Sequence, residues 1–74
     1  MSAGRVWEVT VPNLGETSDT LHAAAAIAMF NPEVIPVILA EDEANLKALQ
    51  DTISSAAEES EYFARIHTRI HRDN

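Results

Sequence analysis

The chain has 74 residues, no cysteine, 46% apolar residues and a formal net charge of −7. The missing cysteine excludes disulfides, thiolate zinc sites and thiol catalysis, and a chain this short forms one domain, residues 1–74, with a modest core. The acidic balance argues against direct nucleic-acid binding, which needs several cations facing phosphates. No apolar stretch reaches the ~20 residues of a membrane span and no export signal is visible, so we expect a cytoplasmic protein without a membrane partner.

The first predicted strand covers residues 5–12, RVWEVTVP, where polarity alternates with a period of two. Trp7 and Val9 share one face of this strand, and Glu8 and Thr10 share the other. The pattern is therefore that of a half-buried strand.

A turn around Asn13 and Gly15 is expected to separate this strand from the first helix. That helix covers about residues 18–30, because the alanine-rich segment LHAAAAIAMF is the best helix former in the chain. It ends before Pro32, since the residue preceding a proline is displaced from the α region.

The second predicted strand covers about residues 35–40, within a nearly unbroken apolar run rich in valine and isoleucine. A run of this length favours a strand that is buried on both faces. Pro36 lacks an N–H group, so we expect it near the start of the strand or on a sheet edge.

The second predicted helix covers about residues 42–60. Leu46, Leu49 and Ile53 recur at intervals of three and four residues, which places them on one stripe. The three acids at 41–43 place negative charge at the positive end of the helix dipole.

The C-terminal segment 62–71, YFARIHTRIH, is compatible with two structures. In one it is the third strand, and in the other residues 61–71 continue the second helix. The strand is favoured because a continued helix would be about 30 residues long, well above the usual ~11–12, and because Tyr, Phe, Ile and Thr are strand formers. On a helix His67 and His71 would stand one turn apart, whereas on a strand they lie about 13 Å apart. No metal site is expected, since even the helix offers no obvious third ligand.

The predicted order is strand, helix, strand, helix, strand, which is a small α/β (or α+β) domain. Such crossovers favour parallel strands with right-handed connections. If both helices cover one face of the sheet, Glu8 shares the other face with the bases of the last strand, and we expect it to pair with one of them. Those bases are Arg65, His67, Arg69 and His71. A strand order that places the helices on opposite faces is the alternative.

Either strand order leaves apolar sheet surface uncovered, because parallel sheets are normally covered on both faces and two helices are too few. We therefore predict a homodimer that forms through the open sheet face or an edge strand. The alternative is that loops and residues 1–4 cover the remainder. The candidate interface residues are Trp7, Ile35, Val37, Leu39, Ile66 and Ile70.

No motif in the chain indicates catalysis, a cofactor or a metal. We therefore predict a small acidic, non-catalytic protein–protein interaction module, such as an adaptor, an assembly subunit or a regulator, with an unidentified protein partner besides itself. The alternative is an acidic mimic of nucleic acid that inhibits a DNA- or RNA-binding protein. The candidate charged contact surface comprises Glu41, Asp42, Glu43, Glu58, Glu59, Glu61, Arg65 and Arg69.

Overall fold

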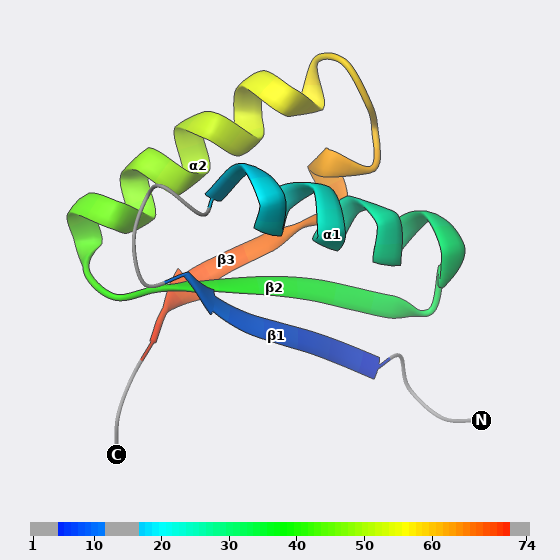
Figure 1. Cartoon of the computed structure of the whole chain (residues 1–74), viewed down its shortest axis with the longest axis horizontal. Coiled ribbons are helices and arrows are strands. Elements are labelled where there is room, and N and C mark those ends of the chain that lie inside the picture. Colours follow the sequence, from blue (N-terminus) through cyan, green and yellow to red (C-terminus); the bar gives the residue numbers. More distant parts are fainter. Residues whose placement is uncertain (1–4, 12–16, 72–74) are drawn as a thin grey trace.

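The computed structural model describes residues 5–11 and 17–71. Three parallel strands and two helices follow one another in the order β-α-β-α-β and form a small α/β domain, as predicted (Figure 1). The turn expected around Asn13 and Gly15, and the covering role considered for residues 1–4, lie outside the described residues. Among the described helices, none is both long and apolar enough to cross a membrane.

The sheet consists of β1 (Arg5–Val11), β2 (Val34–Ala40) and β3 (His67–Ile70), with β2 in the centre. Glu8 of β1 lies beside Val37 of β2, and Val37 lies beside His67 of β3. Because successive side chains of a strand point to opposite faces, these three residues share one face of the sheet.

Both helices, α1 (Thr17–Phe30) and α2 (Glu43–Ala57), lie on the same side of the sheet (Figure 1). The strand order advances in one direction, so two right-handed crossovers must pass over the same face. This settles which of the two predicted arrangements the chain adopts. We call the other side the open face, and its strand residues are Val6, Glu8, Thr10, Ile35, Val37, Leu39, His67 and Arg69.

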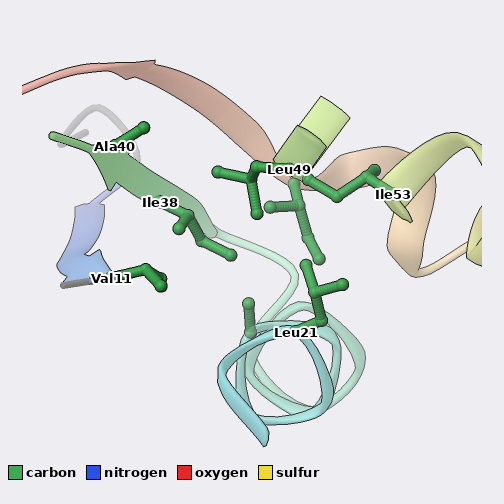
Figure 2. Close-up of a cluster of buried hydrophobic side chains, with 8 residues drawn as sticks. Val11, Leu21, Ile38, Ala40, Leu49 and Ile53 are labelled. Atoms are coloured by element: carbon green, nitrogen blue, oxygen red, sulfur yellow. The ribbon is translucent and has the colours of Figure 1, made fainter. Parts of the chain in front are cut away.

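The core lies between the sheet and the two helices (Figure 2). Ile38 at the centre of β2 is fully buried, and Ala24 and Ala28 of α1 are equally inaccessible. The alanine run therefore lets α1 pack closely over the sheet. The central cluster comprises Val11, Leu21, Ala24, Ile38, Ala40, Leu49, Ile53 and Ile66, with Trp7, Val9, Leu46 and Phe63 packed against it.

Pro36 lies inside the central strand, yet it interrupts no ladder hydrogen bond. The amide of Arg5 donates to the Glu33 carbonyl, and the amide of His71 donates to the Ala40 carbonyl. Alternate residues of β2 therefore bond to β1 and to β3, and the nitrogen of Pro36 faces the β3 side. Since β3 pairs with β2 only from Val37 onward, β2 is still an edge strand at Pro36.

The third strand is shorter than the predicted segment 62–71, and the alternative of a continued helix is wrong. The α2 helix ends at Ala57, and the 3₁₀ helix η2 (Phe63–Arg65) precedes β3. Local hydrogen bonds explain why β3 begins only at His67: the Phe63 amide donates to the Ser60 carbonyl, and the Ile66 amide donates to the Phe63 carbonyl. The backbone before His67 is thus committed to turns and joins no sheet ladder.

Candidate functional site

An ion pair crosses the open face from one edge strand to the other. A guanidinium nitrogen of Arg69 on β3 donates to the Glu8 carboxylate on β1. This confirms the prediction that Glu8 pairs with a base of the last strand. Because β2 lies between β1 and β3, the two side chains must pass over Val37 and Leu39. We call this pair the Glu8–Arg69 bridge.

The bridge accounts for the burial of apolar side chains on a face that no described helix covers. Val37 is 6% exposed and Leu39 is 9% exposed, although both lie on the open face. An ion pair with exposed partners contributes less than about 1 kcal/mol through Coulomb attraction alone. Its larger consequence here is that the side chains of Glu8 and Arg69 cover the centre of the sheet.

The large apolar side chains that remain exposed lie toward one end of the molecule, two on the open face and two on α1, which lies on the other side of the sheet. Val6 and Ile35 are neighbours in register at the starts of β1 and β2. The last turn of α1 lies close by, because only residues 31–33 separate this helix from β2. We call this group the apolar end; its members are Val6 (56% exposed), Met29 (47%), Phe30 (77%) and Ile35 (40%). Within this group, Val6 and Ile35 are adjacent on the open face, and adjacent exposed apolar side chains are more indicative of a contact surface than single ones.

The opposite end of the sheet carries a hollow with a volume of about 670 Å³. It lies where β2 and β3 finish and α2 begins, with apolar walls and charged groups at its rim. In parallel sheets this carboxyl edge is the usual place for ligands. The lining residues are Glu8, Leu39, Leu46, Arg69, Ile70 and His71.

The predicted interface residues are divided between several environments. Ile35 belongs to the apolar end, while Val37 and Leu39 lie beneath the Glu8–Arg69 bridge. Ile70 and Leu39 line the hollow.

Two predicted interface residues belong to the core. Ile66 is buried, and Trp7 packs against the central cluster on the side that the helices cover. A contact surface on the open face therefore excludes both side chains. The alternation of β1 placed Trp7 on the apolar side of the strand, but only the helix positions showed which side is covered.

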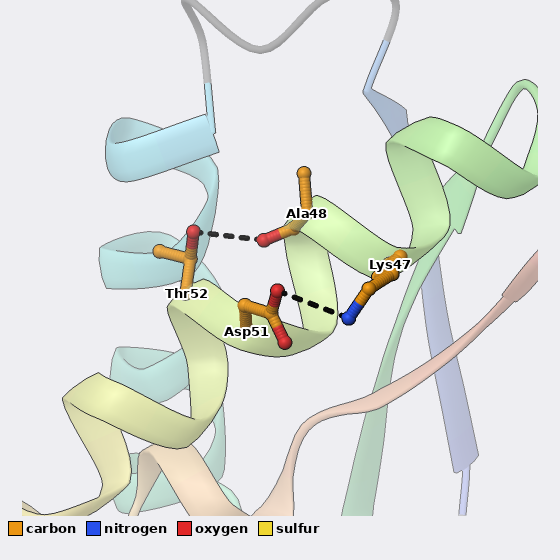
Figure 3. Close-up of polar contacts among 4 residues, drawn as sticks. All are labelled: Lys47, Ala48, Asp51 and Thr52. Atoms are coloured by element: carbon orange, nitrogen blue, oxygen red, sulfur yellow. Dashed lines mark hydrogen bonds and ion pairs between the residues drawn. The ribbon is translucent and has the colours of Figure 1, made fainter.

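The predicted acidic residues form two separate groups at the ends of α2, and all six are exposed. A helix of 15 residues is about 22 Å long, so the groups at 41–43 and 58–61 stand that far apart. Between them Asp51 is paired with Lys47 at 3.5 Å (Figure 3). At the start of α2, the Asp42 carboxylate accepts a 2.8 Å hydrogen bond from the Asn45 amide and caps the helix.

Arg65 does not lie on the open face, which corrects the sequence prediction. Its guanidinium donates to the Ala28 carbonyl at 3.0 Å and to the Pro32 carbonyl at 2.8 Å. The side chain therefore caps the end of α1 from η2. The reason is the late start of β3, which leaves Arg65 in a 3₁₀ turn next to α1.

Sequence reasoning missed three of the four residues of the apolar end, namely Val6, Met29 and Phe30. Phe30 stands in the last helical turn before Asn31 and Pro32, and no apolar stripe continues beyond it. A large aromatic residue at the end of a helix, with no apolar stripe after it, could have been predicted to be exposed. Val6 shares a face with Glu8, which hid its exposure among polar neighbours.

Comparisons with models of known protein families, with curated proteins and with solved structures returned no match. Within the described ranges, no group of three or more His, Asp or Glu residues is placed to hold a metal ion. The function is therefore inferred from the geometry of the chain itself.

Proposed function

We propose that the chain is a small acidic, non-catalytic interaction module of the cytoplasm, an adaptor, assembly subunit or regulator that associates with a second copy of itself. The observation that carries this proposal is the pair of exposed apolar side chains, Val6 and Ile35, on the open face of a parallel sheet, with the exposed Met29 and Phe30 at the same end on α1. Sheets of this type are normally covered on both faces; the Glu8–Arg69 bridge covers the centre of the open face, and a second chain would cover the apolar side chains that it leaves exposed.

In the pairing that we propose, the open faces meet with the strands of the two copies running in opposite directions, and the two Glu8–Arg69 bridges face each other at the centre. Val6 and Ile35 lie at one end of this face, and Leu39 and Arg69, which line the hollow, lie toward the other. A two-fold axis between the sheets, perpendicular to the strands and level with Val37, brings Ile35 of one copy over Leu39 of its partner. Those positions are about 13 Å apart along β2. Val6 and Ile35 of each copy then meet Thr10 and Leu39 of the other, and the same contact forms twice.

The size of the face indicates that the association is weak. Strands of seven, seven and four residues, spaced about 4.8 Å apart and rising about 3.3 Å per residue, give a face of roughly 300 Å² per copy. A standard stable interface covers about 800 Å² per partner. We therefore expect a dimer that dissociates in the micromolar range.

Size-exclusion chromatography with light scattering over a range of concentrations tests this proposal. The native chain should be dimeric at high micromolar concentration, and Ile35→Glu should be monomeric because it places a charge in the apolar end. Ser54→Glu adds the same charge to the exposed surface of α2 and should leave the dimer intact. A native chain that stays monomeric at high micromolar concentration would remove the proposal.

The orientation can be tested separately because the chain has no native cysteine. In the antiparallel pairing, β1 crosses over the β1 of its partner and places Val6 near Thr10. A mixture of Val6→Cys and Thr10→Cys chains should therefore form a disulfide-linked heterodimer, whereas Val6→Cys alone should not link to itself. A dimer without the mixed disulfide would contradict the orientation and leave self-association standing.

The alternative function, an acidic mimic of nucleic acid, requires carboxylates at regular phosphate-like spacing on a continuous surface. The acids of α2 instead form two groups about 22 Å apart, and Asp51 between them is paired with Lys47. This arrangement gives the mimic less support than the apolar end gives to the interaction module.

A further inference from the structure

A groove lies on the opposite layer of the molecule, between α1 and α2, with a volume of about 330 Å³. Its walls come from the first turns of α1, the second half of α2 and the start of η2. We call it the helix groove. The lining residues are Ser18, Leu21, His22, Thr52, Ser55, Ala56, Glu59 and Phe63.

Internal contacts hold the walls of the helix groove in place. The imidazole Nδ1 of His22 lies 2.8 Å from the Ser18 carbonyl oxygen, and the ring meets Phe63 edge to face at 5.6 Å between centroids. On the other wall, the Thr52 hydroxyl donates to the Ala48 carbonyl at 2.9 Å (Figure 3). The groove is therefore formed before any partner arrives, which lowers the entropic cost of binding.

The floor of the helix groove is apolar and accepts a side chain from outside. Leu21 is buried beneath it, and Ala56 and Phe63 are half-buried along its length. Ser55 and Ala56 are small, so α2 leaves space at this point. The volume is at the lower end of the ~300–1,000 Å³ range of ligand pockets, and it suits a few apolar side chains rather than a large cofactor.

The charge around the helix groove is strongly negative. Glu59 lines the groove, and Asp19 in the first turn of α1 and Glu58 and Glu61 after α2 are close to it in the chain. The cations described on this layer are Lys47, which pairs with Asp51, and Arg65, which is bonded to two backbone carbonyls. A surface of this kind attracts positively charged partners and repels acidic ones.

We propose that the helix groove binds a cationic amphipathic segment of a partner protein. Large apolar side chains of the segment enter between Leu21, Ala56 and Phe63, and flanking lysines or arginines face Glu59 and the neighbouring acids. This is the helix-in-groove mode of recognition, in which apolar anchors provide affinity and charges provide selection. The site goes beyond the proposed self-association, because it lies on the layer facing away from the open face. A dimer formed through the open faces would present two such grooves.

A fluorescently labelled synthetic helical peptide of leucine and lysine, titrated with the native chain and followed by anisotropy, tests the proposal. Two control peptides separate the contributions: one has serine in place of leucine, and the other has glutamate in place of lysine. Adjacent serines on α2 supply a matched pair of variants, since both are exposed and only Ser55 lines the groove. Ser55→Trp fills the groove, whereas Ser54→Trp adds the same bulk outside it.

The leucine–lysine peptide should bind, and both control peptides should bind at least about tenfold more weakly, a difference of ~1.4 kcal/mol. Ser55→Trp should weaken binding of the leucine–lysine peptide by about tenfold or more, while Ser54→Trp stays within about twofold of the native chain. Equal binding of the serine-containing peptide would reduce the effect to non-specific charge attraction and overturn the proposal. Equal effects of the two tryptophan variants, or no binding at all, would overturn it as well. None of these results depends on self-association, which is measured separately by light scattering.

Discussion

Replacing Arg65 with methionine should lower the free energy of unfolding by about 2 kcal/mol, because the guanidinium holds the end of α1. Its two nitrogens donate to the Ala28 and Pro32 carbonyls at 3.0 and 2.8 Å. The last turn of α1 contains no basic residue, and the residue that follows the helix is Asn31 rather than the glycine that is common at a helix C-terminus. Arg65 thus supplies from η2 the cap that α1 lacks in its own sequence.

The magnitude follows from the environment of the two hydrogen bonds. A hydrogen bond to a charged group contributes about 1.5–3 kcal/mol when it is shielded from water, and less when it is exposed. The bond to Ala28 is partly buried and the bond to Pro32 is exposed, so the first contributes most. A cation at a helix C-terminus adds about 0.3–1 kcal/mol, and methionine preserves the apolar stem. For a domain of this size, a loss of about 2 kcal/mol lowers Tm by roughly 10 °C.

Urea and thermal unfolding followed by far-UV circular dichroism measure this loss. The protein concentration should stay below the range in which a dimer forms, because self-association adds stability by mass action. Arg65→Lys retains the charge but reaches fewer carbonyls and should lose about half as much. Arg69→Met is the matched control, since its ion pair is exposed and contributes less than about 1 kcal/mol. If Arg65→Met unfolds no more easily than Arg69→Met, the capping explanation is wrong.

Three further outcomes are expected. A double-mutant cycle of Glu8→Gln and Arg69→Met should give a coupling energy below about 1 kcal/mol that falls as salt rises, and a coupling insensitive to salt would contradict an exposed ion pair. Asp42→Ala should destabilise the chain by about 1 kcal/mol by removing the N-cap of α2, whereas its neighbour change Glu41→Ala should be nearly neutral in urea unfolding. Thr17→Val should raise the free energy of unfolding by about 1 kcal/mol, because no hydrogen-bond partner for the buried Thr17 hydroxyl is found among the described residues. The midpoint of thermal unfolding should therefore rise, and a lower midpoint would show that the hydroxyl is bonded.

Local patterns in the chain were sufficient to predict the element order. The period of two in RVWEVTV, the alanine-rich segment before Asn31 and Pro32, and the 3–4 spacing of Leu46, Leu49 and Ile53 each report a neighbourhood of a few residues. These patterns correctly located β1, α1 and α2, and the improbable length of a continued helix together with the strand-forming residues after Glu61 correctly separated α2 from the last strand.

The late start of β3 could not be predicted in this way, because the residues before it have the composition of strand formers. The guanidinium of Arg65 donates a hydrogen bond to the Ala28 carbonyl at the end of α1, 37 residues earlier in the chain. Arg65 makes this bond from the 3₁₀ helix η2 and not from a strand. The burial of Val37 and Leu39 likewise depends on Glu8 and Arg69, which are 61 residues apart.

Sequence periodicity thus specified which segments form strands and helices, and that Glu8 faces away from the side of β1 that carries Trp7 and Val9. Composition alone specified that the chain is acidic. The three-dimensional arrangement alone decided that both helices cover one face, that the exposed apolar surface gathers around Phe30 rather than along β2, and that Arg65 caps a helix. The physical reason is the range of the forces involved. Backbone geometry imposes periods of 2 and 3.6 residues within a single element, whereas the exposure of a side chain depends on which distant element packs above it.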